Sequence, residues 1–405
     1  RSAAGQLRVT AQLVNARDGL QVWSHEFEGN LADVFAVQDE ISRRVIDSLR
    51  ASIDTPDKTQ AARADIDAYN EYLLGRYQLA RRTAESLRLA QSHFEAAINI
   101  DPAYSPSWSA LATTMAVSPW YGPLADPGST AELARSAAQR ALALDESNSE
   151  AWAALGTVSM TFDRKWREAE VSLRRAIELN PRDASNANLY GDYLYITGDY
   201  AEAEKWEGLA AELEPLSAVH QHEIALVYSL TGRIEEAIAA ELRAVALSPE
   251  FSNGWGSLAR FHASVGDLQA VEDVMSSPAA RLNEQSTLML EMYLNAQRGD
   301  LEAARAKADE LLTMAHDGRA SRVVVARAYA MLGDEQQAVE LLTEAQRLAD
   351  PVLISPIYFF LPEDWSSMPD LEKALAHPDL SELHDLRRAS IAAGRGRISG
   401  EATLL

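Results

Sequence analysis

The sequence has no cysteine, too few basic residues to balance its acids and no long apolar run, and each shortage excludes a class of function. Without cysteine there are no disulfides, no thiolate metal ligands and no cysteine nucleophile. The 37 Lys and Arg against 60 Asp and Glu give a net charge of −23, which repels phosphate backbones. We therefore expect no nucleic acid to bind to this chain.

The longest apolar run, PVLISPIYFFLP at residues 351–362, is interrupted by three prolines. It is shorter than the roughly 20 residues that a membrane helix needs, so no membrane span is expected in this chain. The sequence begins at Arg1 without a methionine or an apolar leader, which indicates an internal piece of a longer protein. The compartment stays undetermined, because cytoplasm and periplasm fit the composition equally well.

Patterns of catalytic and metal sites are also missing. The sequence has no glycine-rich phosphate loop, no serine nucleophile elbow and no HExxH pair, and His220 and His222 are spaced wrongly for one helix face. Acidic pairs such as Glu235 and Glu236 adjoin turns, where we expect no apolar pocket to raise their pKa. We expect a chain without catalytic activity, metal or cofactor.

A period of about 34 residues runs through most of the chain. Glycines followed by a charged residue recur at spacings of 34, 34, 33 and 34 residues, at Gly198, Gly232, Gly266, Gly299 and Gly333. Prolines keep the same interval at Pro181, Pro215 and Pro249. Glycine and proline at these intervals are typical of a unit of two helices and two turns.

The residues within each unit resemble the tetratricopeptide repeat (TPR). The third unit matches that pattern at Trp152, Leu155, Gly156, Ala169, Leu173, Ala176 and Pro181. The resemblance implies a mainly α fold, a right-handed superhelix of about seven units over residues 68–350. The second unit carries the insertion VSPWYGPLADPGST, predicted to form a loop. We interpret the repeated alanines, glycines and tryptophans as core rather than as binding residues.

Residues 1–53 differ from the repeats. Leu7, Val9, Ala11 and Leu13 alternate with polar residues, Asp18 and Gly19 suit a tight turn, and residues 21–29 alternate again. Apolar residues at helical spacing predict a helix over 30–53, and residues 54–67 are polar and typical of a linker. The sequence therefore predicts a β-hairpin and a helix ahead of the repeats.

Three segments of this region resemble the last strands and the last helix of the TolB-like domain, and they are RVTAQLVNARDG, QVWSHEFEGNL and DVFAVQDEI. That domain precedes TPR units in CadC-type winged-helix regulators and in class III adenylate cyclases. The resemblance implies a bacterial signalling or transcription-regulating protein, with residues 1–53 the C-terminal part of a truncated α/β domain. We expect the hairpin to complete its sheet with another chain, as in a homo-oligomer, or with a segment outside residues 1–405.

Residues 351–405 follow the last repeat and begin with a cluster of apolar and aromatic residues. Because the last unit of a solenoid leaves an apolar face exposed, we interpret this segment as an aromatic cap and a flexible tail. A partner-binding peptide is the alternative.

The concave face of the superhelix is the candidate site. Positions on the first helix of each unit are predicted to point inward, and they are Asn188, Asp192, Tyr195, His222, Asn253, Arg260, Tyr293 and Arg327. They suit recognition of a protein or peptide, with Arg260 and Arg327 as cationic anchors, although an ordinary solvated face fits equally well. The clamp that some TPR proteins use for chaperone tails is not reproduced, because the first unit has Tyr72 and Arg76 at its positions.

Three functions remain open at this point. The first is a non-catalytic interaction scaffold that forms the sensory region of a larger regulator. The second is an assembly or secretion scaffold without a signalling role, and the third is the regulatory region of an adenylate cyclase whose catalytic domain lies elsewhere. The identity of the partner is not encoded in any motif.

Overall fold

A computed structural model describes residues 2–3, 6–14, 21–30, 66–122, 124, 126–348, 350–355 and 385. The chain divides into two compact units, Arg1–Arg63 and Ala64–Leu405, and each is described by itself.

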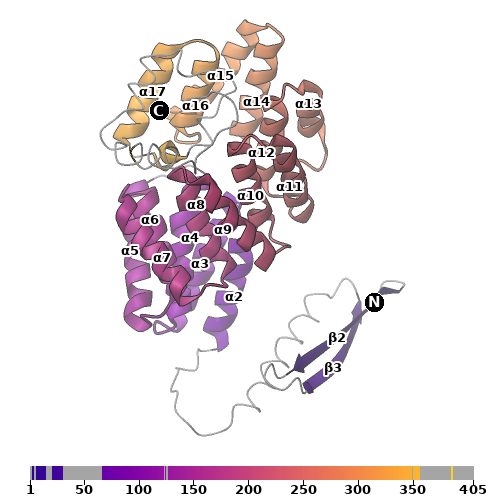
Figure 1. Ribbon diagram of the computed structural model, residues 1–405, viewed down its shortest axis with the longest axis vertical. Helices are drawn as coiled ribbons and strands as arrows, with labels where there is room; N and C mark the ends of the chain where they lie inside the picture. Colours follow the sequence, from indigo (N-terminus) through magenta and orange to yellow (C-terminus); the bar gives the residue numbers. More distant parts are fainter. Residues whose placement is uncertain are drawn as a thin grey trace. The chain divides into compact units, whose positions relative to one another are not determined.

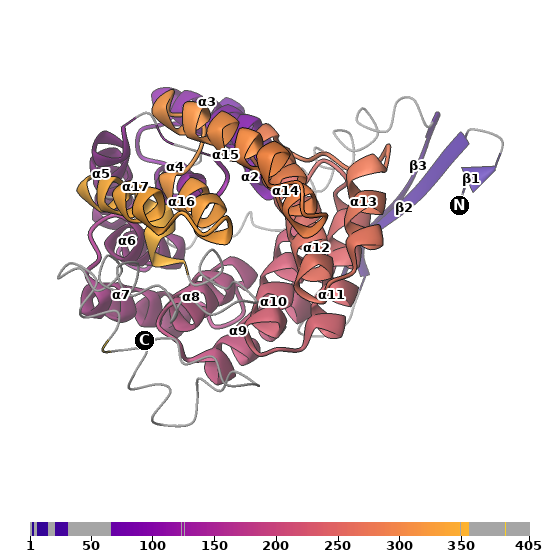
Figure 2. The same cartoon turned by 90° about the horizontal axis from the view of Figure 1, so that it is seen from above.

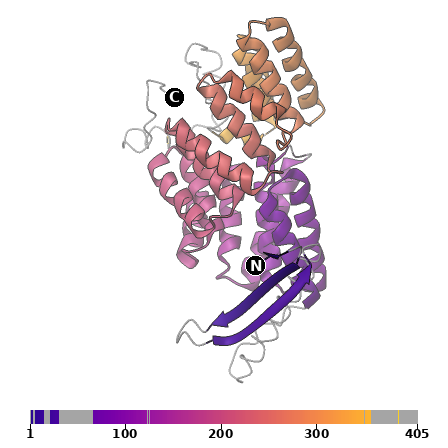
Figure 3. The ribbon, with the colours of Figure 1, turned by 90° about the vertical axis from the view of Figure 1, so that its right-hand side faces the viewer.

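The first unit contains three antiparallel strands in the order β1-β2-β3. They are β1 (Ser2–Ala3), β2 (Gln6–Val14) and β3 (Gln21–Asn30), drawn in indigo in Figure 3. In the register of β2 and β3, Val9 lies opposite Phe27 and Ala11 opposite His25, and the pairing is irregular at Leu13/Val14. The predicted turn at Asp18 and the predicted helix over 30–53 lie outside the described residues. The assignment of this unit to a truncated α/β domain stays a prediction.

The second unit consists of consecutive helix pairs (Figure 1). The first helices are α2 (Ile66–Arg81), α4 (Ser105–Val117), α6 (Ser149–Thr161), α8 (Ala184–Ile196), α10 (Ala218–Leu230), α12 (Ser252–Ser264), α14 (Glu284–Gln297) and α16 (Arg322–Met331). The second helices are α3 (Ala84–Ile100), α5 (Pro127–Leu144), α7 (Trp166–Leu179), α9 (Tyr200–Leu213), α11 (Ile234–Leu247), α13 (Leu268–Ser276), α15 (Leu301–His316) and α17 (Glu335–Arg347).

The described residues thus hold eight pairs, one more than the seven counted from the sequence. The sixth pair is the least regular, because its second helix, α13, has only nine residues. The repeat pattern is matched there only on α12 and at the turn that follows, at Trp255, Leu258 and Gly266.

Glycine makes the turn inside five of the pairs. Gly198, Gly232, Gly266, Gly299 and Gly333 have φ between +73° and +87°, a left-handed conformation that glycine adopts without steric cost. The first and third pairs place arginine in the left-handed conformation instead, Arg82 with φ 50° and Arg164 with φ 56°. A side chain other than glycine costs about 1 kcal/mol there, so these two arginines are candidates for a role of their own.

Small residues let the two helices of a pair approach closely, as the repeat pattern predicts. A Cβ added to Gly156 would lie 2.6 Å from Cγ of Leu173, and one added to Gly75 would lie 2.5 Å from the Phe94 ring. A Cβ on Gly191 would meet the carboxyl group of Glu207 on α9. Close packing of this kind is why the first helices cannot carry a larger residue at these positions.

The repeated tryptophans support the turns between pairs. The indole Nε1 of Trp108 donates to the carbonyl of Pro102 at 3.0 Å, that of Trp152 to Glu146 at 3.1 Å, and that of Trp255 to Pro249 at 2.8 Å. In each case the acceptor lies six residues earlier, in the preceding turn. These three indoles therefore hold one repeat against the next.

The helix pairs of the second unit follow one another along a curved path (Figure 2). Two short 3-10 helices contact each other, and they are η2 (Ser118–Trp120) in the insertion of the second pair and η3 (Pro351–Ile354) after the last pair. All four residues of η3 are buried, and the capping role of the C-terminal segment stays a prediction. The rest of the predicted cap and tail, apart from Ser355 and Asp385, lies outside the described residues.

Candidate functional site

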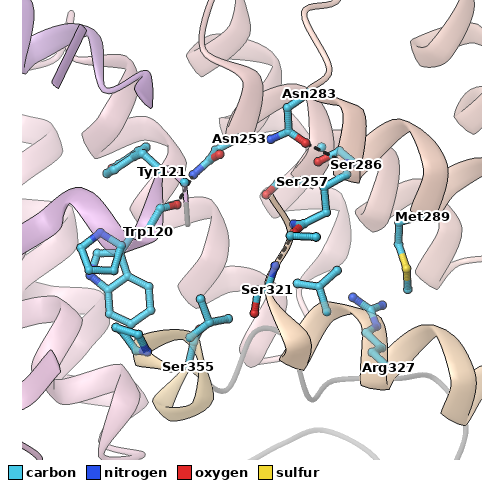
Figure 4. A pocket seen from close by; sticks show the side chains of 18 of the residues that line it. Trp120, Tyr121, Asn253, Ser257, Asn283, Ser286, Met289, Ser321, Arg327 and Ser355 are labelled. Atoms are coloured by element: carbon cyan, nitrogen blue, oxygen red, sulfur yellow. Dashed lines mark hydrogen bonds between the residues drawn. The ribbon is translucent and has the colours of Figure 1, made fainter. Parts of the chain in front are cut away.

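The second unit encloses a cavity of about 1190 Å³. Its walls come mainly from the first helices α8, α10, α12, α14 and α16, which face the inside of the winding (Figures 2 and 4). The eight residues predicted for the concave face all line this one cavity, and they are Asn188, Asp192, Tyr195, His222, Asn253, Arg260, Tyr293 and Arg327. Whether they bind a partner remains a prediction.

The insertion of the second pair forms one wall, which the sequence reasoning did not assign to the site. Figure 4 shows Trp120 and Tyr121 on one side of the cavity and Met289 and Arg327 on the other. Asn253 Nδ2 donates to the Trp120 carbonyl at 3.0 Å and so attaches the insertion to α12. Two neighbouring aromatic residues in a loop rich in proline and glycine are the signal that could have located this wall.

Tyr121 is packed on both sides. Its ring centroid lies 6.3 Å from that of Phe251, and the guanidinium of Arg82 lies 5.6 Å from the Tyr121 centroid. Arg82 is one of the two arginines in a left-handed conformation, and it also lines the cavity. The first turn of the repeat array, a short loop that the sequence did not single out, therefore supplies a cation to the site.

Buried carboxyl groups stand at the end of the cavity formed by α8 and α10. Asp192 on α8 and Glu223 on α10 line it, and Glu207 on α9 lies behind Asn188, whose Nδ2 donates to Glu207 Oε2 at 3.1 Å. Burial raises the pKa of Asp192 to about 7 and that of Glu223 to about 8, against a smaller opposing effect of Arg82. Burial also raises the pKa of Glu207 well above its ordinary value, and the neighbouring Asp192 and Glu223 add to the effect.

These pKa shifts correct a sequence-based expectation. Glu235 and Glu236 are exposed beside a turn, as expected, but other carboxyl groups do lie in a pocket that raises their pKa. The expectation that no pocket raises a carboxyl pKa was wrong, because it considered only the residues close to each acid in the sequence. Glu207 and Glu241 lie on second helices and face the first helices, and sequence spacing alone does not reveal that they are fully buried.

His222 forms a buried pair with Glu241. Its Nδ1 lies 3.0 Å from both carboxyl oxygens, with 6% of the His222 side chain and none of the Glu241 side chain exposed. Burial by itself lowers the pKa of His222, but attraction to Glu241 outweighs it and the pKa is raised overall. Arg260 on α12 adds positive charge nearby, which partly offsets the rise in the pKa of Glu241 that burial causes.

The cavity wall formed by α12, α14 and α16 carries hydroxyl, amide and charged groups. Tyr293 Oη donates to the Ala263 carbonyl at 2.9 Å, and the Ser321 amide donates to Gln285 Oε1 at 2.9 Å. Arg260 donates to Ser257 Oγ at 2.9 Å. The residues of these contacts come from three helix pairs and line the same cavity.

Tyr72 and Arg76, where a chaperone-tail clamp would require other residues, lie away from this cavity. Arg76 forms an ion pair with Glu150 at 2.7 Å, and Tyr72 packs edge to face on Tyr104 with centroids 5.5 Å apart. Among the described residues no cluster of three or more His, Asp or Glu side chains could hold a metal ion. Within the same residues, no helix combines the length and apolarity that membrane crossing requires.

Comparison with solved structures identifies the fold of the helical array. Human IFIT1 in a dimer with PPP-AAAA matches 79% of this chain and 79% of its own, at a TM-score of 0.52 and 16% identity. The monomeric IFIT1 mutant with Gppp-AAAA matches 89% and 77%, at a TM-score of 0.52 and 14% identity. The second unit is a TPR-like helical repeat.

Comparison of sequences gives less about this TPR-like protein. No protein-family model matches it. A putative adenylate cyclase 3 of Rhizobium meliloti is 28% identical over 132 residues, which are 31% of this chain. The match spans only 22% of that relative's length. TolB-like and CadC-type membership stays a prediction from the N-terminal sequence.

Proposed function

We propose that this chain is a non-catalytic interaction scaffold whose TPR-like repeat binds a segment of a protein partner inside the central cavity. The observation that carries the proposal is the convergence of eight inner-face side chains from five helix pairs on one cavity. The insertion and η3 contribute further residues to its walls and contact each other.

A peptide segment suits the cavity better than a small ligand. Its volume of about 1190 Å³ exceeds the range of roughly 300 to 1,000 Å³ that is typical of small-molecule sites. Hydroxyl, amide, guanidinium and aromatic groups are spread along its walls, and an extended peptide offers backbone and side-chain partners for all of them.

A regulatory role in a larger bacterial signalling protein is the finer part of the proposal. It is supported by the likeness of residues 1–53 to a TolB-like segment and by the stretch of similarity to a putative adenylate cyclase. The latter favours a second candidate, the regulatory region of a cyclase. Sequencing the complete gene separates the two candidates, because a winged helix or a cyclase domain is recognisable from its sequence.

Nucleic acid remains an unlikely cavity ligand on electrostatic grounds. The IFIT1 structures were determined with PPP-AAAA and Gppp-AAAA, but their likeness to this chain concerns the fold. Here the net charge is −23 and carboxyl groups line one end of the cavity. Both features oppose the entry of phosphate groups.

Reversing two charges of the cavity is expected to abolish partner binding. The double variant Arg260→Glu with Arg327→Glu replaces two guanidinium groups that line the cavity by carboxylates. A partner in the cavity then loses its attraction to these two cations. Partners are cross-linked to the full chain in cells and compared by mass spectrometry, with circular dichroism as a check of folding.

The matched control is Arg175→Glu with Arg347→Glu. It changes the net charge equally at side chains that are 47% and 71% exposed and lie outside the cavity. We expect the control to keep the partners that the cavity variant loses. An unchanged partner set in the folded cavity variant contradicts binding inside the cavity.

A further inference from the structure

The buried charges at the α8 and α10 end of the cavity do not balance. Asp192, Glu207, Glu223 and Glu241 supply four carboxyl groups, and Arg82, Arg260 and His222 supply three cationic groups. Ionised together, the seven groups carry one excess negative charge in a buried place. The raised pKa values of Asp192, Glu207 and Glu223 favour protonated carboxyl groups, which removes this excess charge.

One carboxyl oxygen of this cluster has no hydrogen-bond partner. Glu223 is only 8% exposed, its Oε2 is buried without a partner, and the residue lines the cavity. Buried acceptors in proteins are almost always paired, so an orphan at a cavity wall indicates where a ligand donor belongs. The strongest donors for a carboxylate are ammonium and guanidinium groups.

The chain itself places a guanidinium beside these acids. Arg82 lies over the Tyr121 ring at 5.6 Å and attracts both Asp192 and Glu223. It does so from a turn position where five other pairs use glycine, in spite of the left-handed backbone. This arrangement of acids and aromatic rings is suited to cations, and Arg82 alone does not saturate it.

We infer that the α8 and α10 end of the cavity binds an arginine or lysine side chain of the partner segment, between Asp192 and Glu223. The inference rests on the proposed function and names the chemistry of its partner. The incoming cation replaces a proton held on Asp192 or Glu223, so one proton leaves as the side chain binds. Glu223 Oε2 gains the donor that it lacks in the empty cavity.

The groups that face this position come from every helix around it. They are Asp192 and Tyr195 on α8, Glu207 on α9, His222 and Glu223 on α10, Glu241 on α11, Arg260 on α12, Tyr121 in the insertion and Arg82 in the first turn. His222 and Arg260 are engaged with Glu241 and Ser257. Proton exchange with the ligand is therefore expected to involve chiefly Asp192 and Glu223.

The test uses the full chain and four peptides, acetyl-Gly-Gly-X-Gly-Gly-amide with arginine, lysine, norleucine or glutamate at X. Calorimetry in two buffers of different ionisation enthalpy measures affinity and proton release together. We expect the arginine or lysine peptide to bind at least about tenfold more tightly than the norleucine peptide. Its binding should release protons and weaken between pH 9 and pH 6, because protonated carboxyl groups no longer attract the cation.

Variants locate the effect. Glu223→Gln is expected to reduce the affinity for the cationic peptide about tenfold and to remove most of the proton release. Glu302→Gln is the matched control, with the same change of charge at an exposed residue outside the cavity. It should leave affinity and proton release unchanged.

Each other outcome has a distinct meaning. Equal binding of all four peptides without proton release overturns the cation site and leaves peptide binding in place. Preferred binding of the glutamate peptide overturns it in favour of an anion held by Arg82 or Arg260. Binding of none of the peptides contradicts the proposed function itself. If Glu223→Gln fails to fold, the cation site is still tested by whether the unaltered chain releases protons when it binds the cationic peptide.

Discussion

Replacing His222 by leucine is expected to lower the free energy of unfolding at neutral pH by about 3 to 5 kcal/mol, because it leaves the buried Glu241 carboxylate without its cation. The Glu241 side chain is not exposed at all, so water cannot compensate for the loss. Urea unfolding followed by circular dichroism measures the change. The cost should shrink in acid, where the carboxyl group becomes neutral.

Two further variants are compared with His222→Leu. His93→Leu removes the same kind of pair, since His93 Nδ1 lies 2.7 Å from Glu71, but 28% and 32% of the two side chains are exposed. We expect it to cost less than about 1 kcal/mol. Removing both partners in His222→Leu with Glu241→Leu should recover much of the loss. An equal cost for His222→Leu and His93→Leu contradicts the buried pair.

Raising the pH from 6 to 9 is expected to destabilise the folded chain by up to about 4 kcal/mol. The pKa of Asp192 is raised to about 7 and that of Glu223 to about 8, so the folded state holds protons that the unfolded chain has already released. A raised carboxyl pKa contributes stability at low pH that disappears as the pH passes through the folded-state value. Glu207, whose pKa is raised as well, acts in the same direction.

The pH dependence is measured as the unfolding free energy in urea at intervals between pH 6 and 9. Glu223→Gln, which is neutral throughout, should flatten the slope, whereas the exposed Glu302→Gln should not change it. Stability that is constant or increases over this range contradicts the protonated carboxyl cluster.

The repeat architecture could be predicted closely because it is encoded by residues that lie close together in the sequence. The glycines of five turns, the motif tryptophans and the small residues of the helix contacts have roles set by the few residues around them. The inner face followed directly, since one position in a helix fixes the direction of the next. Even so, the sequence count gave about seven pairs, whereas the described residues hold eight.

The cavity could not be predicted as a site in the same way. Asn253 contacts the Trp120 carbonyl across 133 residues of sequence, and η2 meets η3 from the other end of the array. Such contacts depend on the accumulated rotation from pair to pair, which no single repeat encodes. Glu207, Glu241 and Arg82 were missed for the same reason, because their neighbours lie on other helices.

The most direct test of binding inside the cavity is methyl NMR of the full chain labelled at its eight methionines. Met289 and Met331 line the cavity, and Met289 is visible in Figure 4, whereas Met160 and Met292 are fully buried elsewhere in the core. On titration with a peptide long enough to reach from Glu223 to Arg327, with arginine at one end, we predict shifts at Met289 and Met331 and none at Met160. Shifts confined to methionines outside the cavity, with Met289 and Met331 unchanged at saturation, contradict the account.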